Sequence, residues 1–173
     1  MLSYPPGPGT SALRRGRFSE PQRPCFVTWV TTNRERVFAD FEPGCWMARL
    51  LDDVACWPGA TVDAWILMPD HVHALIRPDE RPLSDVIGRV KGRTAFEFNC
   101  RFGRKRPLWQ RGFHDRAARA HLNLVDALRY MLQNPVRAGL VQELGEYPFW
   151  NCRWADAPGW LDSLDRGMLG AGP

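Results

Sequence analysis

Residues 61–77 read TVDAWILMPDHVHALIR, and the architecture expected for the chain can be built around them. Thr61–Met68 and His71–Arg77 are rich in β-branched and aromatic residues, a composition typical of strands. Pro69 and Asp70, which separate the two runs, favour a turn. We therefore expect two antiparallel strands joined as a hairpin.

Further strands and helices alternate on both sides of this hairpin. Cys25–Thr32 has the composition of another strand, whereas Pro43–Cys56 carries apolar residues at helical spacing. After the hairpin, Leu83–Phe102 predicts a long basic helix and His121–Asn134 a further helix that stops at Pro135. This alternation favours an α+β fold: a ferredoxin-like antiparallel sheet with helices packed on it.

The length of 173 residues is that of one domain. An apolar content of 45% allows a real core and excludes global disorder. We expect a flexible Pro-, Gly- and Arg-rich arm at 1–22, one domain at 23–154 and a loose tail at 155–173. No run approaches the roughly 20 apolar residues of a membrane span, so a cytoplasmic protein without a membrane partner is expected. The five cysteines lack CxxC spacing, which favours reduced thiols.

The net charge of +4 hides an uneven distribution. Between Arg89 and Arg119 there are ten basic and two acidic residues, so this window is near +8 and the rest near −4. Such a basic block suggests a polyanion partner, because the guanidinium of Arg can bind two phosphate oxygens at once. Trp109 and Phe113 are candidates for stacking on an unpaired base, and Trp109 is also compatible with packing in the core. The candidate DNA-contacting cations are Arg89, Lys91, Arg93, Arg104, Lys105, Arg106, Arg111, Arg119 and Arg137.

His71 and His73 are separated by one residue, so a strand would place both imidazoles on one face. Two neutral imidazoles side by side are two ligands for a divalent metal ion, and a further oxygen or amide ligand would have to come from elsewhere. Taken alone, the pair is also compatible with two half-exposed structural histidines. Leu75 excludes a histidine-triad nucleotide hydrolase, which needs its third histidine at that position.

Tyr130 is one of only three tyrosines and lies in the helix predicted over His121–Asn134. At helical spacing it falls outside the apolar face and beside Asp126 and Asn134. Such a tyrosine is either a surface residue without a role or a nucleophile. As a nucleophile it would need a metal-polarised phosphate or a nearby base, because the usual pKa of tyrosine is about 10.

Several segments, in this order, resemble the REP-associated tyrosine transposases, a branch of the single-tyrosine HUH (His-hydrophobic-His) transposase family. PDHVHALI at 69–76 resembles the HUH motif. LWQRGFHDRAAR at 108–119 and RYMLQNPVRAGLV at 129–141 resemble the branch in which a tyrosine precedes Asn-Pro-Val-[Arg/Lys]. YPFWNCRW at 147–154 is similar to its Tyr/Trp-Pro-Phe-Ser segment. The resemblance covers about residues 14–154.

The resemblance implies an HUH endonuclease-type domain and a metal-dependent single-stranded DNA endonuclease and strand transferase, a transposase. By it, His71, His73 and Asn134 would bind Mg²⁺ or Mn²⁺. Tyr130 would attack the scissile phosphate, forming a 5′-phosphotyrosine and freeing a 3′-hydroxyl. No nucleotide cofactor is expected, because the covalent intermediate conserves the phosphodiester energy. The implied partner is single-stranded or hairpin DNA of repetitive palindromic elements, bound at the nucleoid by a monomer or homodimer.

The sequence departs from the family pattern at Arg116, where relatives often carry His, and at Ala118, where they often carry a bulky aliphatic residue. His114 lies nearby but in a different register. These departures leave open a domesticated, catalytically inactive protein that binds hairpin DNA or RNA. A small metal-dependent nucleotide hydrolase is disfavoured, because a small substrate does not need ten cations. Whether the tyrosine serves its own or a partner's site stays open.

Overall fold

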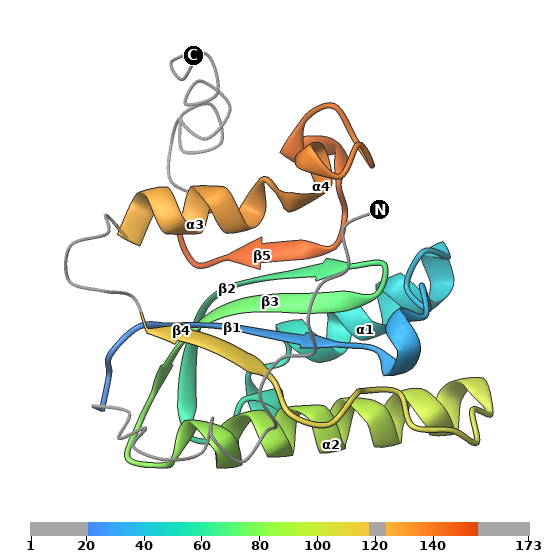
Figure 1. Ribbon diagram of the computed structural model, residues 1–173, viewed down its shortest axis with the longest axis horizontal. Coiled ribbons are helices and arrows are strands. Elements are labelled where there is room, and N and C mark those ends of the chain that lie inside the picture. The colour runs from blue at the N-terminus through green and yellow to red at the C-terminus, as the bar shows by residue number, and fades with distance from the viewer. Residues whose placement is uncertain (1–20, 118–123, 156–173) are drawn as a thin grey trace, which may run out of the picture.

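The computed structural model describes residues 21–117 and 124–155 (Figure 1). Nearly all of the predicted arm and tail therefore lies outside the described residues. A five-stranded sheet in the order β4-β1-β3-β2-β5 forms the centre of the molecule, and every adjacent pair is antiparallel. Its strands are β1 (Cys25–Val30), β2 (Ala60–Met68), β3 (His71–Pro78), β4 (His114–Ala117) and β5 (Trp150–Cys152).

Helices connect and cover these strands. They are α1 (Phe41–Asp52), α2 (Leu83–Phe102), α3 (Leu124–Leu132) and α4 (Asn134–Arg137), with 3-10 turns η2 (Thr32–Arg34), η3 (Val54–Cys56) and η4 (Leu144–Glu146). Up to β4 the chain runs β-α-β-β-α-β, the ferredoxin-like order. The predicted α+β fold is thus confirmed, and β5 extends the sheet beyond β2.

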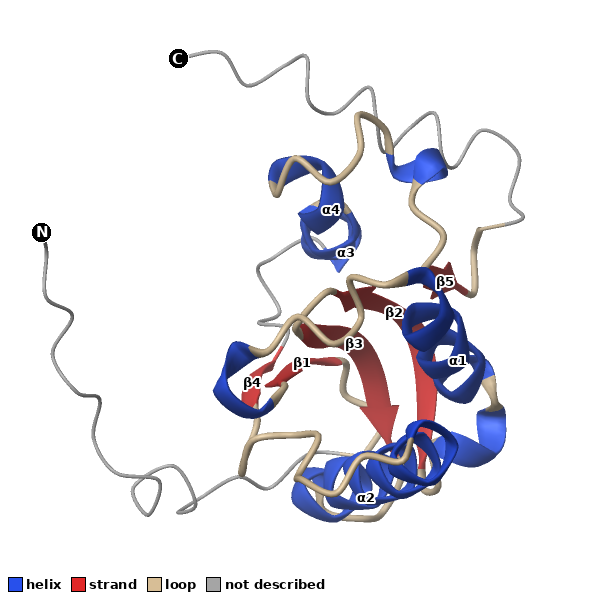
Figure 2. Cartoon of the chain, turned by 90° about the vertical axis from the view of Figure 1, so that its right-hand side faces the viewer, coloured by secondary structure: helices blue, strands red, loops and turns tan. Residues whose placement is uncertain are grey.

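The helices form two layers, with α1 and α2 on one face of the sheet and α3 and α4 on the other (Figures 1 and 2). β2 is buried without interruption from Asp63 to Met68, as expected of a strand covered on both faces. On β1, Trp29 faces the α1–α2 layer and contacts Trp57 and Trp109 edge-to-face, with ring centroids 6.1 Å apart in both pairs. Because side chains alternate along a strand, Thr28 faces the other layer.

The hairpin and the long helix agree closely with the sequence prediction. β2 and β3 pair through the turn at Pro69 and Asp70, and α2 has the predicted bounds. α2 ends at Gly103, whose φ of 63° is the left-handed conformation that glycine favours after a helix. The helix predicted over Pro43–Cys56 is α1 followed by η3, because Asp53 leaves helical geometry and its carboxylate accepts a hydrogen bond from the Ala55 amide.

Trp109 requires a correction. Its side chain lies in the core, 7% exposed, with Nε1 donating to Thr94 Oγ1 at 3.0 Å. Its ring also packs on Phe38 with centroids 5.5 Å apart. A ring enclosed in this way has no free face on which to stack a base, so the prediction that Trp109 stacks on DNA is wrong. Phe113 is partly buried against the same core.

All five cysteines are free thiols, and Cys25, Cys56 and Cys152 are buried. Burial raises the pKa of the Cys56 thiol to about 12. No helix in the described part of the chain has the length and apolarity needed to cross a membrane.

Candidate active site

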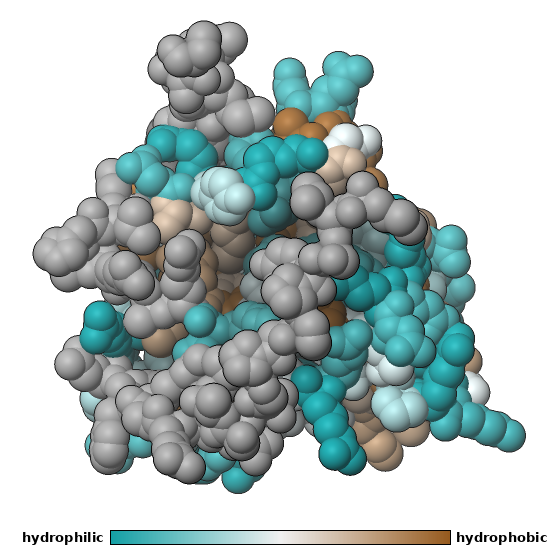
Figure 3. Space-filling model, in the orientation of Figure 1, coloured by the Kyte–Doolittle hydropathy of each residue, from teal (hydrophilic) through white to brown (hydrophobic). Residues whose placement is uncertain are grey.

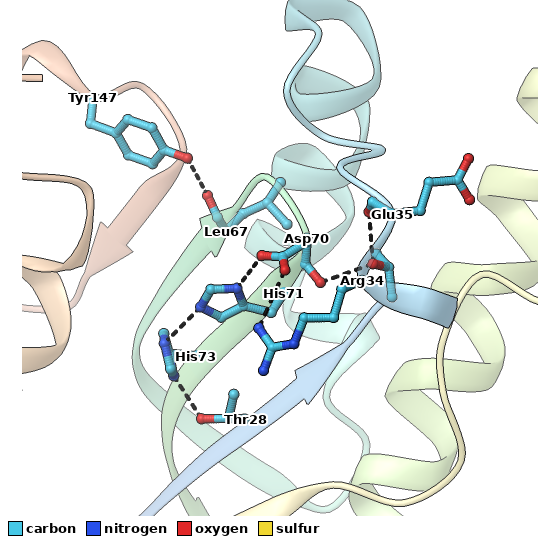
Figure 4. Close-up of polar contacts among 9 residues, drawn as sticks. Thr28, Arg34, Glu35, Leu67, Asp70, His71, His73 and Tyr147 are labelled. Atoms are coloured by element: carbon cyan, nitrogen blue, oxygen red, sulfur yellow. Dashed lines mark hydrogen bonds and ion pairs between the residues drawn. The ribbon is translucent and has the colours of Figure 1, made fainter. Parts of the chain in front are cut away.

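The two histidines of β3 face the α3–α4 layer and meet at their Nε2 atoms, 3.0 Å apart (Figure 4). The prediction that they share a face is confirmed. Their rings are nearly perpendicular, with centroids 4.6 Å apart. In the sheet, His71 pairs with Val30 and His73 with Thr28 on β1. The central strand thus holds both imidazoles at one point of the sheet surface.

Neighbouring side chains hold the other nitrogen of each ring (Figure 4). His71 Nδ1 lies 2.5 Å from Asp70 Oδ1, and Arg34 Nη1 donates to Asp70 Oδ2 at 3.3 Å. His73 Nδ1 lies 2.6 Å from Thr28 Oγ1. Outer contacts of this type fix the ring orientation of metal-binding histidines and leave the second nitrogen for the metal.

Burial lowers the pKa of His73 to about 3, and charge interactions with His71, Arg137 and Arg34 add to this effect. Its imidazole is therefore neutral near pH 7, the form that binds metal. Burial opposes ionisation of Asp70, but its hydrogen bonds and charge interactions with His71 and Arg34 outweigh burial and hold its pKa below the usual value. The carboxylate beside His71 is thus ionised.

The η2 turn brings Arg34 to Asp70. Asn33 and Arg34 both have left-handed backbones, with φ of 56° and 54°, a conformation that costs free energy for residues other than glycine. Buried Thr31 stabilises the turn, because its amide donates to the Asp70 carbonyl at 2.8 Å and its Oγ1 lies 2.7 Å from the Glu35 carbonyl. The turn is thereby fixed to the β2–β3 hairpin.

Tyr130 stands on α3, which packs against β2 through the buried residues Leu128, Met131 and Leu132. Its own side chain is 65% exposed, so the prediction that it lies outside the apolar face is confirmed. In the described chain this helix covers the sheet that carries the histidine pair of the same molecule (Figure 2).

Asn134 is the first residue of α4, which corrects the single helix predicted through it. Pro135 has no N–H to donate to the Met131 carbonyl, and Asn134 Nδ2 donates to that carbonyl instead, at 2.6 Å. This bond engages the amide nitrogen of Asn134 and leaves its amide oxygen for other partners. An amide oxygen is a ligand that Mg²⁺ accepts, whereas the amide nitrogen is not.

Arg137 adjoins both of these residues. Its guanidinium lies over the Tyr130 ring, 3.6 Å from the centroid, and donates to Asn134 Oδ1 at 3.0 Å. Its charge also lowers the pKa of His73. Among the described residues, no three His, Cys, Asp and Glu side chains gather into a metal-binding cluster.

The sequence profile of the IS200-like transposases matches residues 25–130, more than half of the chain. The chain belongs to this family. It is accordingly a transposase, an enzyme that cleaves and joins DNA. No curated protein matches the sequence closely enough to be counted as a relative.

Two solved structures share the fold of this transposase. A REP-associated tyrosine transposase, solved bound to a REP hairpin, is 22% identical with a TM-score of 0.63, and the match covers 92% of each chain. A candidate transposase from Deinococcus radiodurans R1 is 23% identical with a TM-score of 0.52, over 72% of this chain and 96% of that chain.

The predicted DNA-contacting cations of the transposase do not form one surface beside the histidines. Arg89, Lys91 and Arg93 lie on α2, across the sheet from them (Figure 1). Lys91 Nζ donates to the Gln110 carbonyl at 2.7 Å and to the Gly112 carbonyl, and burial lowers its pKa to about 8. It therefore supports the loop that follows α2.

That loop holds two further predicted cations in ion pairs. Arg104 and Arg106 both contact Glu35, at 2.7 and 2.5 Å, and the Arg104 side chain is only 11% exposed. Lys105 and Arg111 are exposed, whereas Arg119 lies outside the described residues. Among the cations that the structure describes, Arg137 contacts both Tyr130 and Asn134.

Sequence reasoning missed the residues that support the histidine pair. Asp70 gave a usable signal, because an acidic residue directly precedes His71. Thr28 and Arg34 gave none, since they reach the pair through strand pairing and through the η2 turn. His114, which lies opposite Thr28 in the β1–β4 pair, is also near this point of the sheet.

Proposed function

We propose that this transposase is a metal-dependent, single-stranded DNA endonuclease and strand transferase that works through a 5′-phosphotyrosine. The histidine pair carries the proposal: its Nε2 atoms lie 3.0 Å apart, and both Nδ1 atoms are held by the protein. Two adjacent ligands of one octahedral ion have this separation when each lies about 2.1 Å from the ion. The pair thus fits a small divalent cation.

Three side chains of this chain would hold Mg²⁺ or Mn²⁺: His71 and His73 through Nε2, and Asn134 through Oδ1. A neutral His73 and an Asn134 amide whose nitrogen is already bonded both favour this set. When bound, the ion would polarise the scissile phosphate and neutralise part of its charge.

Tyr130 is the proposed nucleophile. Its phenolic oxygen would form a bond to phosphorus and lose its proton, while the bond from phosphorus to the 3′ oxygen breaks and that oxygen takes up a proton. The fragment on the 3′ side of the cut would remain on the tyrosine through its 5′ phosphate. The reverse reaction with another 3′-hydroxyl would join strands, and no nucleotide cofactor is needed because the number of phosphoester bonds is conserved.

The proposed substrate is single-stranded or hairpin DNA, including repetitive palindromic elements. The REP-associated transposase of the same fold was solved with a REP hairpin, and exposed cations such as Lys105 and Arg111 can contact phosphates. We infer that residues 23–154 form the catalytic domain, acting at the nucleoid as a monomer or homodimer.

A second candidate is a transposase relative that binds hairpins without cleaving them. The position of Arg116 favours it: this residue lies in β4 opposite Phe26, two residues along the strand from His114, which pairs with Thr28. An arginine there replaces the histidine that the resemblance leads us to expect, and a lost catalytic group would leave DNA binding intact.

The test is a denaturing gel with 3′-labelled single-stranded DNA that contains hairpins from the flanks of the gene, with and without Mn²⁺. We expect a covalent adduct only with the metal, and none with Tyr130→Phe or His73→Ala. Circular dichroism of both variants checks that they are folded. A shifted native band without any adduct across tiled flanking sequences would favour the binding protein.

A further inference from the structure

A single guanidinium connects the two proposed functional residues at the end of α3. Arg137 lies over the ring of Tyr130, 3.6 Å from the ring centroid. Its Nη1 donates to the Tyr130 carbonyl at 3.0 Å, and its Nη2 donates to Asn134 Oδ1, also at 3.0 Å. The ring of the nucleophile and the amide oxygen of the third ligand are therefore held by one side chain.

The break between the two helices makes this arrangement available. Asn134 and Pro135 are the first two residues of α4, and the amide of Arg137 donates to the Gln133 carbonyl at 3.0 Å. This single turn returns the side chain of Arg137 over Tyr130. A planar guanidinium can stack on a ring and donate along two directions at once, which the ammonium of lysine cannot do.

The charge of Arg137 is not used in an ion pair within the described residues, where no carboxylate lies within 4 Å of it. The side chain is exposed, yet two of its nitrogens donate to the transposase itself rather than to solvent. These bonds point to a role within the site. A simple contact with a DNA phosphate would leave the nitrogens free for phosphate oxygens.

We propose that Arg137 is a positioning residue that fixes the Tyr130 ring and the Asn134 oxygen relative to each other. The inference rests on the proposed function, because it assigns the orientation of that nucleophile and ligand. Misplacing a reacting group by about 1 Å can cost on the order of 100-fold in rate. Loss of Arg137 should therefore slow the chemical step far more than it weakens DNA binding.

Arg137→Lys separates positioning from charge. It retains the positive charge but loses the stacked plane and one of the two directed hydrogen bonds. We expect the single-turnover rate of adduct formation to fall by about 100-fold and Mn²⁺ affinity by about 10-fold, while the Kd for hairpin DNA changes less than about threefold. Arg137→Gln, which removes the charge, should show the same loss of rate.

Arg129→Lys is the matched control, because Arg129 precedes Tyr130 on α3 and pairs with Asp126 at 2.8 Å. Its rate and Mn²⁺ affinity should stay close to those of the unmodified transposase. An Arg137→Lys protein that keeps its rate and Mn²⁺ affinity but loses DNA affinity would overturn the proposal, since Arg137 would then be a phosphate contact.

A spectroscopic readout keeps this test independent of activity. With 3-fluorotyrosine incorporated, the three tyrosines give three ¹⁹F resonances, and Tyr130→Phe assigns the relevant one. We expect Arg137→Lys to shift the Tyr130 resonance and leave that of buried Tyr147 unchanged. An unmoved Tyr130 resonance would overturn the positioning role. The unmodified transposase could form no adduct while Arg137→Lys still shifts the Tyr130 resonance. That result would contradict the proposed function and support the contact of Arg137 with Tyr130.

Discussion

Asp70 and Thr28 determine how the two imidazoles are presented. Each binds one Nδ1 atom, at 2.5 and 2.6 Å, so the Nε2 atoms face each other on the α3–α4 side of the sheet. Asp70 is itself held by Arg34. The pair is therefore oriented before any metal binds, which reduces the cost of ordering the ligands.

Replacing Asp70 tests this orientation. Asp70→Asn removes the ionised acceptor beside His71 Nδ1, so we expect Mn²⁺ affinity to fall by about 10- to 100-fold, as measured by isothermal titration calorimetry. Asp79→Asn removes the same charge from an exposed position, where Asp79 accepts a hydrogen bond from Gln22, and should leave the affinity unchanged. Equal affinities for the two variants would contradict the role of Asp70.

The buried hydroxyl of Tyr147 is expected to stabilise the fold in a pH-dependent way. Its hydroxyl donates to the Leu67 carbonyl at 2.6 Å, and burial raises its pKa to about 12. The folded state thus favours the protonated phenol, so the stabilisation is complete below pH 10 and is lost as the pH rises towards 12. Tyr147→Phe should cost about 1–2 kcal/mol of unfolding free energy at pH 7.

Urea unfolding at pH 7, 10 and 11.5 provides the measurement. Tyr147→Phe lacks the ionisable phenol. The difference in unfolding free energy between this variant and the unmodified transposase should therefore become smaller at the highest pH. A difference in unfolding free energy that stays constant across the three pH values would show that the Tyr147 hydroxyl is not buried as described.

The helix α1 approaches the segment before β5 so closely that only glycine fits at one position. A Cβ on Gly44 would lie 2.5 Å from Cζ of Phe149, and the ring of Phe149 is buried. The carbonyl of Phe149 also accepts a hydrogen bond from the Leu67 amide at 2.9 Å. Close packing at Gly44 thus helps to place the chain that leads into the edge strand.

Gly44→Ala should therefore lower the unfolding free energy by about 1–3 kcal/mol, because the buried ring has to move. Gly88→Ala on α2 is the control: nothing lies within 4 Å of its added Cβ, and the change should stabilise the helix by up to about 1 kcal/mol. Urea unfolding of both variants measures the difference. If both variants changed the unfolding free energy in the same direction and by the same amount, the ring of Phe149 would not restrict the side chain at position 44.

Elements that are defined by their own sequence could be predicted, whereas elements that are defined by pairing with distant strands could not. α2 and the β2–β3 hairpin follow from local pattern, because their apolar spacing and the Pro69-Asp70 turn lie within each segment. β4 and β5 were not predicted, since each is short and is defined by pairing with β1 or β2.

In the candidate site, local spacing identified His71, His73 and Tyr130. Thr28, Arg34 and the orientation of Asn134 depend on tertiary contacts or on the missing N–H of Pro135. These contacts join segments that are distant in the sequence, which is why spacing alone could not reveal them.

Over the whole molecule, the sheet separates two surfaces. The histidine pair faces α3 and α4, whereas the cations of α2 lie on the opposite side (Figure 2). Most of the described surface seen in Figure 3 is hydrophilic, and apolar residues gather around α4. The basic residues between Arg89 and Arg119 therefore do not form one continuous surface beside the histidines. DNA that reaches the histidines would approach from the side of α3 and α4.

The packing of α3 on β2 of the same chain predicts that Tyr130 serves the histidine pair of its own molecule. A mixture of His73→Ala and Tyr130→Phe proteins should then form no covalent adduct with DNA, because no single molecule has both groups. A denaturing gel of the mixture measures this, with the unmodified transposase as the positive control. Restored adduct would show that the tyrosine acts in a partner's site.

The central claim is that Tyr130 becomes covalently linked to DNA at a metal site formed by His71 and His73. Mass spectrometry of the trypsin-digested adduct tests it most directly, because cleavage after Arg129 and Arg137 releases the peptide Tyr130–Arg137 with a single tyrosine. We predict nucleotide mass on this peptide only when Mn²⁺ is present, and none with His73→Ala. Nucleotide on a peptide containing Tyr147, or on Tyr130 without any divalent metal, would contradict the account.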